Sequence, residues 1–116
     1  MMNGEIWWVD FEEPFGSEPG FKRPAVVLQN NELNQSGINT FVVVPLTTNI
    51  RLEDYQGNVF VSSEVSNLPK DSVAIGTLIT SVDKNRFIEK TGKLQTSVFQ
   101  EVLDAVNWVI GGLNAN

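Results

Sequence analysis

The sequence has 116 residues, 41% of them hydrophobic and 19% charged, and it contains neither histidine nor cysteine. This length predicts a single domain, residues 1–116, with a modest core. The two missing residue types exclude disulfide scaffolds, thiolate nucleophiles, Ser-His-Asp triads and metal sites built on cysteine or imidazole. Any catalysis must therefore use Arg, Lys, Ser, Thr, Tyr or carboxylates.

The net charge is −6, from eight Lys plus Arg and fourteen Asp plus Glu. Such a chain lacks the broad basic face expected of a general nucleic-acid binder. Residues 1–58 hold only three basic side chains, and two of them, Lys22 and Arg23, are adjacent. The pair is a candidate anion-binding feature, although a solvated surface pair is the simpler interpretation.

The chain shows no sign of secretion or membrane insertion. Residues 1–10 lack the basic start of a signal peptide. The longest apolar stretch, residues 41–46, is far shorter than the roughly 20 residues of a membrane span. These features predict a soluble, cytoplasmic protein.

The first predicted strand, residues 5–11, alternates between two apolar faces. Trp7, Val9 and Phe11 would share one face, and Ile6 and Trp8 the other. Two faces that are both apolar indicate a strand that packs on both sides.

Further strands follow along the chain. Residues 25–29 and 40–46 are continuous apolar runs, which are typical of strands at the centre of a sheet or in a small barrel. Shorter candidates are residues 59–61, 72–75 and 78–82.

Loops rich in turn residues separate these strands. Residues 12–20 contain two prolines and two glycines, and this loop is longer than a simple hairpin requires. Residues 49–58 form a second polar loop, and residues 68–71 a third break.

The last segment has helical periodicity. Apolar residues spaced by three and four predict an amphipathic helix over residues 96–110. Ser97 and Gln100 fit a capping box, and the glycines at 111 and 112 mark its end. Trp108 lies beside the apolar stripe and is expected to be packed. The predicted architecture is mainly β with a C-terminal helix, as a small, strongly curved sheet or barrel.

The first chemical candidate is Arg23. Pro24 favours an extended backbone at Arg23 and so presents it at the mouth of a strand. Beside Ser17 and Glu18, its guanidinium could bind a phosphate bidentately. Alternatively, Arg23 pairs with Glu18 and only fixes the loop.

Two more segments carry polar groups. Thr47, Thr48 and Asn49 directly follow a buried strand, where a threonine hydroxyl could donate to a phosphoryl oxygen; taken alone, a plain turn is the simpler interpretation. Residues 83–86 could form a phosphate patch, but their mixed charges favour a solvated turn or short helix.

Several short motifs follow one another in a fixed order: GEIWWVD at 4–10, GSEPG at 16–20, Arg23-Pro24, VVVPLT at 42–47, GNV at 57–59, LPKDSV at 68–73, VDK at 82–84 and a GKL turn at 92–94. Over roughly residues 3–110, the chain resembles the MazF/PemK toxin family. No single motif carries the resemblance, whereas their order does.

The resemblance implies a small SH3-like β-barrel of the CcdB/PemK type that forms a homodimer. It implies an endoribonuclease, an mRNA interferase, that cuts single-stranded RNA without metal or cofactor. The ribose 2′-hydroxyl attacks the phosphorus and leaves a 2′,3′-cyclic phosphate and a 5′-hydroxyl. A cognate MazE-like antitoxin silences such toxins.

The family's catalytic arginine before proline corresponds to Arg23, and its strand-end threonine to Thr47. Arg23 would stabilise the charge that develops on the phosphorane, and Thr47 would orient the phosphate. The positions expected to bind substrate are Ser17, Glu18, Lys22, Thr48 and Asn49.

The chain departs from the family pattern at several positions. An Arg and an Asp that some PemK-type members use as acid and base are replaced by Ile75 and Thr77. A frequent Gln and Arg are replaced by Leu78 and Thr80, and a loop His by Ser17. These losses leave open a non-catalytic toxin of the same fold, such as a gyrase poison of the CcdB type, or a degenerate binding module.

Overall fold

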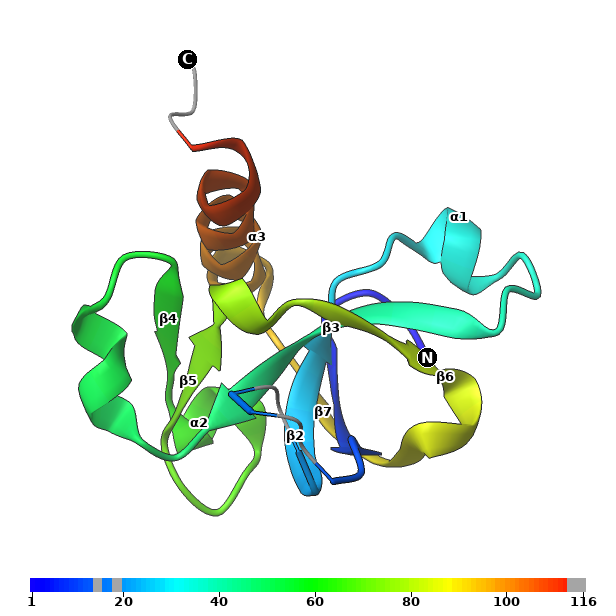
Figure 1. The fold of residues 1–116 in the computed structure, drawn as a ribbon, viewed down its shortest axis with the longest axis horizontal. Helices are drawn as coiled ribbons and strands as arrows, with labels where there is room; N and C mark the ends of the chain where they lie inside the picture. Colours follow the sequence, from blue (N-terminus) through cyan, green and yellow to red (C-terminus); the bar gives the residue numbers. More distant parts are fainter. Residues whose placement is uncertain (14–15, 18–19, 113–116) are drawn as a thin grey trace.

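A computed structural model describes residues 1–13, 16–17 and 20–112 of the chain. The described strands form one antiparallel, seven-stranded sheet, followed by the long helix α3 (Figure 1). The strands are β1 (Glu5–Asp10), β2 (Lys22–Val27), β3 (Thr40–Thr47), β4 (Asn58–Val61), β5 (Ser72–Ile75), β6 (Thr80–Asp83) and β7 (Phe87–Lys93). The helices are α1 (Asn31–Asn34), α2 (Ser63–Ser66) and α3 (Thr96–Gly111), with 3-10 helices η1 (Ile50–Asp54), η2 (Gly76–Leu78) and η3 (Lys84–Arg86).

The sheet is organised around β3. Its strand order is β4-β5-β3-β2-β1-β7, and β6 also pairs with β3. The first half of β3 pairs with β6, whereas its end, from Leu46 to Thr47, pairs with β5. This change of partner curves the sheet strongly. The expected class, mainly β with a C-terminal helix, is confirmed, although the described ladder does not close into a complete barrel.

Two hydrophobic cores lie on the two faces of the sheet. Ile6 and Trp8 belong to the first core, which α3 covers with Val102 and Val106. The second core contains Val9, Ala25, Val27, Phe41, Val43 and Val82, with Trp7 and Phe11 packed against it. The predicted alternation of β1 is therefore confirmed. Burial of each large aliphatic side chain stabilises the fold by about 1.5–3 kcal/mol.

Helix α3 begins at Thr96, as the sequence predicts, and ends at Gly111, one residue beyond the predicted end. Gly112 follows its last residue with φ +72°, a conformation that favours glycine. The predicted capping box is wrong, because Gln95 is the N-cap and no side chain caps the first turn. Trp108 covers Gly57 but stays 37% exposed, so its expected packing is partial.

None of the helices within the described part of the chain combines the length and apolarity needed to cross a membrane.

Several other boundaries differ from prediction. The turn expected at residues 92–94 is wrong, because its first two residues end β7. This edge strand is largely exposed and pairs with β1 through two register shifts, so it has no clear apolar alternation. Strand β2 begins at Lys22, which places Arg23 inside the strand. Strand β6 begins at Thr80, after η2.

Candidate functional site

Arg23 is the second residue of β2 and is half-buried. Its cross-strand partner on β1 is Val9, which is fully buried in the second core. Because paired residues of a sheet project to the same side, Arg23 lies on the face of the second core. Its Nε is buried and has no hydrogen-bond partner within residues 1–13, 16–17 and 20–112. Buried N–H groups are nearly always paired, so this guanidinium suits an incoming anion.

Thr47 is the last residue of β3 and is also half-buried. Four residues after Val43 of the second core, it lies on the same face of its strand. Its Oγ1 accepts a hydrogen bond of 3.2 Å from the backbone N–H of Asn49. A hydroxyl that accepts in this way keeps its proton for donation to a ligand.

The register of β2 and β3 relates these two side chains. The last pair of this ladder is Ala25 with Pro45. Continued by two residues, the same register sets Arg23 opposite Thr47. The ladder ends there because β3 turns to pair with β5. A cationic donor and a hydroxyl donor thus share one face at the point where the two strands separate.

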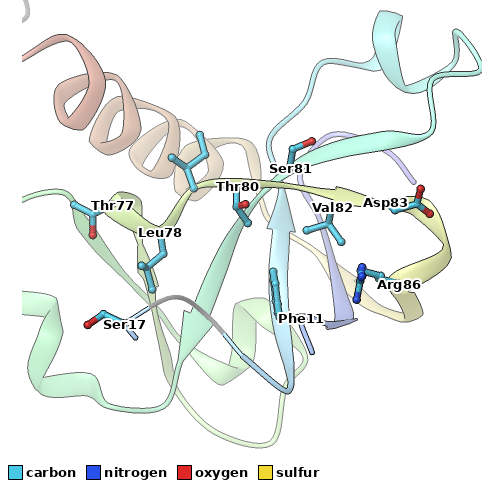
Figure 2. A pocket seen from close by; sticks show the side chains of 10 residues that line it. Phe11, Ser17, Thr77, Leu78, Thr80, Ser81, Val82, Asp83 and Arg86 are labelled. Carbon is cyan, nitrogen blue, oxygen red and sulfur yellow. The ribbon is translucent and has the colours of Figure 1, made fainter. Parts of the chain in front are cut away.

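A hollow of about 530 Å³ opens on the same face. Figure 2 shows that it runs from Ser17 and Leu78 at one end to Asp83 and Arg86 at the other, with Phe11 between them. Val82, which belongs to the second core, lies along its length. The cross-strand partner of Thr80, another lining residue, is Val43 of that core. The hollow thus opens in part on the face that carries Arg23 and Thr47, although neither of these two residues lines it.

Four of the five positions at which the chain departs from the expected family pattern gather in this hollow, and the fifth, Ile75, is buried in the core. Ser17, Thr77, Leu78 and Thr80 all line it. Hydroxyl groups and an aliphatic side chain thus stand where the pattern has His, Asp, Gln and Arg. The three hydroxyl groups can accept and donate hydrogen bonds, Leu78 offers only apolar contact, and none of the four brings positive charge.

The other predicted site residues are not all brought together. Lys22 is exposed, and as the neighbour of Arg23 it projects to the opposite face. It lies across from Asp10 and lines a second hollow of about 640 Å³. Thr48 and Asn49 are exposed beside Thr47, and Glu18 lies outside the described residues.

Arg86 belongs to the segment 83–86, for which the sequence allows a phosphate patch but favours a solvated turn or short helix. The short helix expected at residues 83–86 is confirmed as η3. However, Arg86 lines both hollows and forms an ion pair of 2.7 Å with Glu12. The hydrogen bond to Glu12 raises the pKa of the guanidinium above its ordinary value. The mixed charges of this segment gave no signal of its position, which depends on the pairing of β6 with β3.

Glu5 is a buried carboxylate away from the hollow. It accepts hydrogen bonds from the backbone N–H of Met2 and from Trp7 Nε1, both 2.9 Å, and pairs with Lys90 at 3.1 Å. Burial opposes its ionisation, but the hydrogen bonds from Trp7, Met2 and Lys90 outweigh that effect and lower the pKa of Glu5. Its partners make this a structural group that ties β1 to β7.

Comparison with known proteins decides the family. A family model described as "PemK-like, MazF-like toxin of type II toxin-antitoxin system" matches residues 2–110. The chain belongs to this family. The resemblance seen in the ordered sequence motifs is thereby confirmed. The toxin is 35% identical over 98 residues to the endoribonuclease MazF2 of Mycobacterium bovis, covering 84% of this chain and 86% of that protein.

Solved structures share the fold of this MazF-like toxin. MazF from Deinococcus radiodurans superposes with a TM-score of 0.80 at 23% identity, covering 96% of each chain. A mycobacterial endoribonuclease in complex with its cognate antitoxin gives 0.77 at 17% identity, covering 99% of each chain. At these identities, the likeness establishes the fold alone.

Proposed function

We propose that this protein is the toxin of a type II toxin–antitoxin pair and an endoribonuclease that cuts single-stranded RNA, mRNA in particular. Family membership and the 35% identical endoribonuclease support this function. The observation that carries the site assignment is the buried, unpartnered Nε of Arg23, among the described residues, on the face shared with Thr47. It provides an anion site with two donors and a fixed geometry.

In the proposed reaction the RNA supplies its own nucleophile. The ribose 2′-oxygen attacks the adjacent phosphorus and loses its proton as the new P–O bond forms. The bond from phosphorus to the 5′-oxygen breaks, and that oxygen takes up a proton. The products are a 2′,3′-cyclic phosphate and a 5′-hydroxyl, and no metal takes part. A chain without histidine or cysteine can support this reaction because no protein nucleophile is needed.

Arg23 and Thr47 are the proposed catalytic residues. The guanidinium of Arg23 stabilises the negative charge that grows on the phosphorane, and it remains protonated throughout. Thr47 donates its hydroxyl proton to a phosphoryl oxygen and holds the phosphate for in-line attack. The acid and base of some PemK-type members have no counterpart here, because Ile75 and Thr77 occupy those positions.

The substrate-binding assignments follow the same face. Ser17 contributes a hydroxyl to the hollow, and Glu18 follows it in the chain. Thr48 and Asn49 extend the site beyond Thr47. Lys22 acts from the opposite face, where its charge attracts RNA without touching the scissile phosphate.

The proposed partners follow from family membership. One structural relative is a mycobacterial endoribonuclease solved in complex with its cognate antitoxin. By analogy, a MazE-like antitoxin binds this toxin and blocks its site. The active form is a homodimer, and it works in the cytoplasm, where its mRNA substrate is found.

Incubation of the purified toxin with a long RNA in the presence of EDTA tests the function. Cuts at defined short sequences, with 5′-hydroxyl and cyclic phosphate ends, are expected. The Arg23→Ala protein should fold and dimerise but leave the RNA intact. Intact RNA with the unaltered toxin, across varied sequences, would favour the non-catalytic interaction toxin. Full cleavage by Arg23→Ala would refute the site.

A further inference from the structure

Arg86 stands where the two hollows meet. It lines the first hollow together with Ser17 and Phe11, and the second together with Asp10 and Glu12. Among the described residues that line the first hollow, Arg86 is the basic one. Figure 2 shows its side chain on the same side of β6 as Phe11. RNA that fills this hollow therefore meets the guanidinium of Arg86.

The partner of Arg86 is a carboxylate that a phosphate can displace. The Arg86–Glu12 pair is 2.7 Å long, and its side chains are 38% and 63% exposed. Exposed ion pairs contribute little, because water and salt screen them. A phosphodiester offers the same guanidinium two oxygens in a geometry that favours a bidentate pair. Exchange of one anion for the other thus costs little.

Glu12 is held in place as a competitor. Its backbone has φ +63°, and its carbonyl oxygen accepts a hydrogen bond from the N–H of Phe21. The N–H of Phe11 donates in turn to the carbonyl oxygen of Phe21. These bonds fix Glu12 where the loop after β1 begins, so its carboxylate stays close to Arg86 when the ion pair opens.

We propose that Arg86 binds a second phosphate of the RNA, distinct from the scissile one, and that Glu12 competes with this phosphate and so limits the affinity of the toxin. This inference rests on the proposed endoribonuclease function. It gives one acidic residue of this acidic chain a specific role: the carboxylate of Glu12 regulates Arg86, one of the few cationic residues that can contact RNA. Loss of the negative charge at Glu12 releases Arg86 to the RNA.

Binding of an uncleavable 2′-O-methyl oligoribonucleotide, measured by fluorescence anisotropy at several salt concentrations, tests the proposal. Glu12→Gln should bind about two- to fivefold more tightly than the unaltered toxin. Glu13→Gln is the matched control, because this exposed neighbour lines neither hollow and its replacement changes the net charge equally. It should bind like the unaltered toxin.

Arg86→Gln should weaken binding and reduce the slope of log K against log salt by about 0.7, the value for one phosphate contact to a single strand. Lys70→Gln, on an exposed loop, is its matched control and should leave the slope unchanged. In the double variant Glu12→Gln/Arg86→Gln, the gain from Glu12→Gln should disappear. That loss shows that Glu12 acts through Arg86 and does not merely repel RNA.

Two failures are distinguishable. If the toxin binds and cuts RNA but Glu12→Gln and Arg86→Gln behave like their matched controls, the inference about Arg86 is wrong while the proposed function stands. A gain from Glu12→Gln that persists in the double variant also refutes it. If no variant binds the oligonucleotide and the unaltered toxin cuts no RNA, the proposed function falls, and the inference with it.

Discussion

Arg23 and Thr47 lie two residues beyond Ala25 and Pro45, the last pair of the β2–β3 ladder, on the face of the sheet that carries the second core. Both lie close to buried residues in the sequence. Ala25, two residues after Arg23, and Leu46, directly before Thr47, are almost completely buried. Each is held by a neighbouring strand, Arg23 opposite Val9 of β1 and Thr47 opposite Val73 of β5. We therefore expect the proposed catalytic pair to be preorganised for the phosphate before RNA binds.

Replacement of Arg23 should separate activity from stability. Arg23→Met removes the guanidinium and keeps an unbranched side chain, so cleavage should fall about a hundred- to thousandfold. Stability should rise by about 1 kcal/mol, because a buried N–H without a partner among the described residues is lost. Initial cleavage rates and urea unfolding measure the two effects. A large loss of stability would show that Arg23 is a structural residue.

At Thr47, the hydroxyl and the methyl group can be tested separately. Thr47→Val keeps the shape but loses the hydrogen-bond donor, which should lower the cleavage rate about ten- to a hundredfold. Thr47→Ser keeps the hydroxyl and should retain most of the rate. Equal rates for the two variants would remove the Thr47 hydroxyl from the reaction. Unfolding curves control for the lost bond to the Asn49 N–H.

Glu5 should make stability depend on pH. Its pKa is lowered in the folded chain, so near the ordinary value of 4.5 the folded state binds fewer protons than the unfolded state. The stabilisation that ionised Glu5 gives the folded state is complete above its ordinary pKa of 4.5 and is lost as the pH falls through its lowered pKa in the folded state. The stability gap between the unaltered toxin and Glu5→Gln should therefore shrink from pH 7 towards pH 3. Glu89→Gln, on the exposed face of β7, is the control, and its stability should differ from that of the unaltered toxin by a small amount. If the stability gap changes with pH in the same way for both variants, Glu5 does not have this role.

Two glycines should respond oppositely to alanine. A Cβ at Gly76 would collide with the backbone carbonyl oxygen of Gly57, whose neighbourhood is fixed by α3. Gly76→Ala should cost about 1–3 kcal/mol of stability. A Cβ at Gly111, the last residue of α3, meets nothing, so Gly111→Ala should stabilise the helix by up to about 1 kcal/mol. Thermal unfolding of both variants tests the pair, and an unaffected Gly76→Ala protein would contradict the close approach.

Local pattern was sufficient for the strands with strong alternation or continuous apolar character. β1 was predicted with the correct residues on each face, and β5 with the correct ends. β7 escaped prediction because an exposed edge strand with register shifts carries few apolar residues. The start of α3 at residue 96 is predicted correctly, but its N-cap is Gln95, whose side chain makes no capping hydrogen bond, and not Ser97.

For the site, the sequence predicts individual candidate residues but not how the fold arranges them in space. Strand-end position and chemistry identify Arg23 and Thr47 as candidates. Their shared face depends on the pairing of β2 with β3, which no local pattern encodes. The position of Arg86 depends on a further pairing, between β6 and β3, so the mixed charges of residues 83–86 alone do not distinguish a phosphate patch from a solvated turn or short helix. Lys22, adjacent to Arg23 in sequence, projects the other way for the simple reason that strand residues alternate.

Strand β7 follows the other six strands in the chain, yet it is the neighbour of the first one, β1. A ribosome that translates this chain therefore exposes Arg23 and Thr47 well before β1 receives its second partner. Until residues 87–93 have left the exit tunnel, one edge of β1 has no β7 strand to pair with. The carboxylate of Glu5 then also lacks its ion-pair partner Lys90. The order of synthesis thus leaves β1 with a single partner strand until β7 has been made and pairs with it.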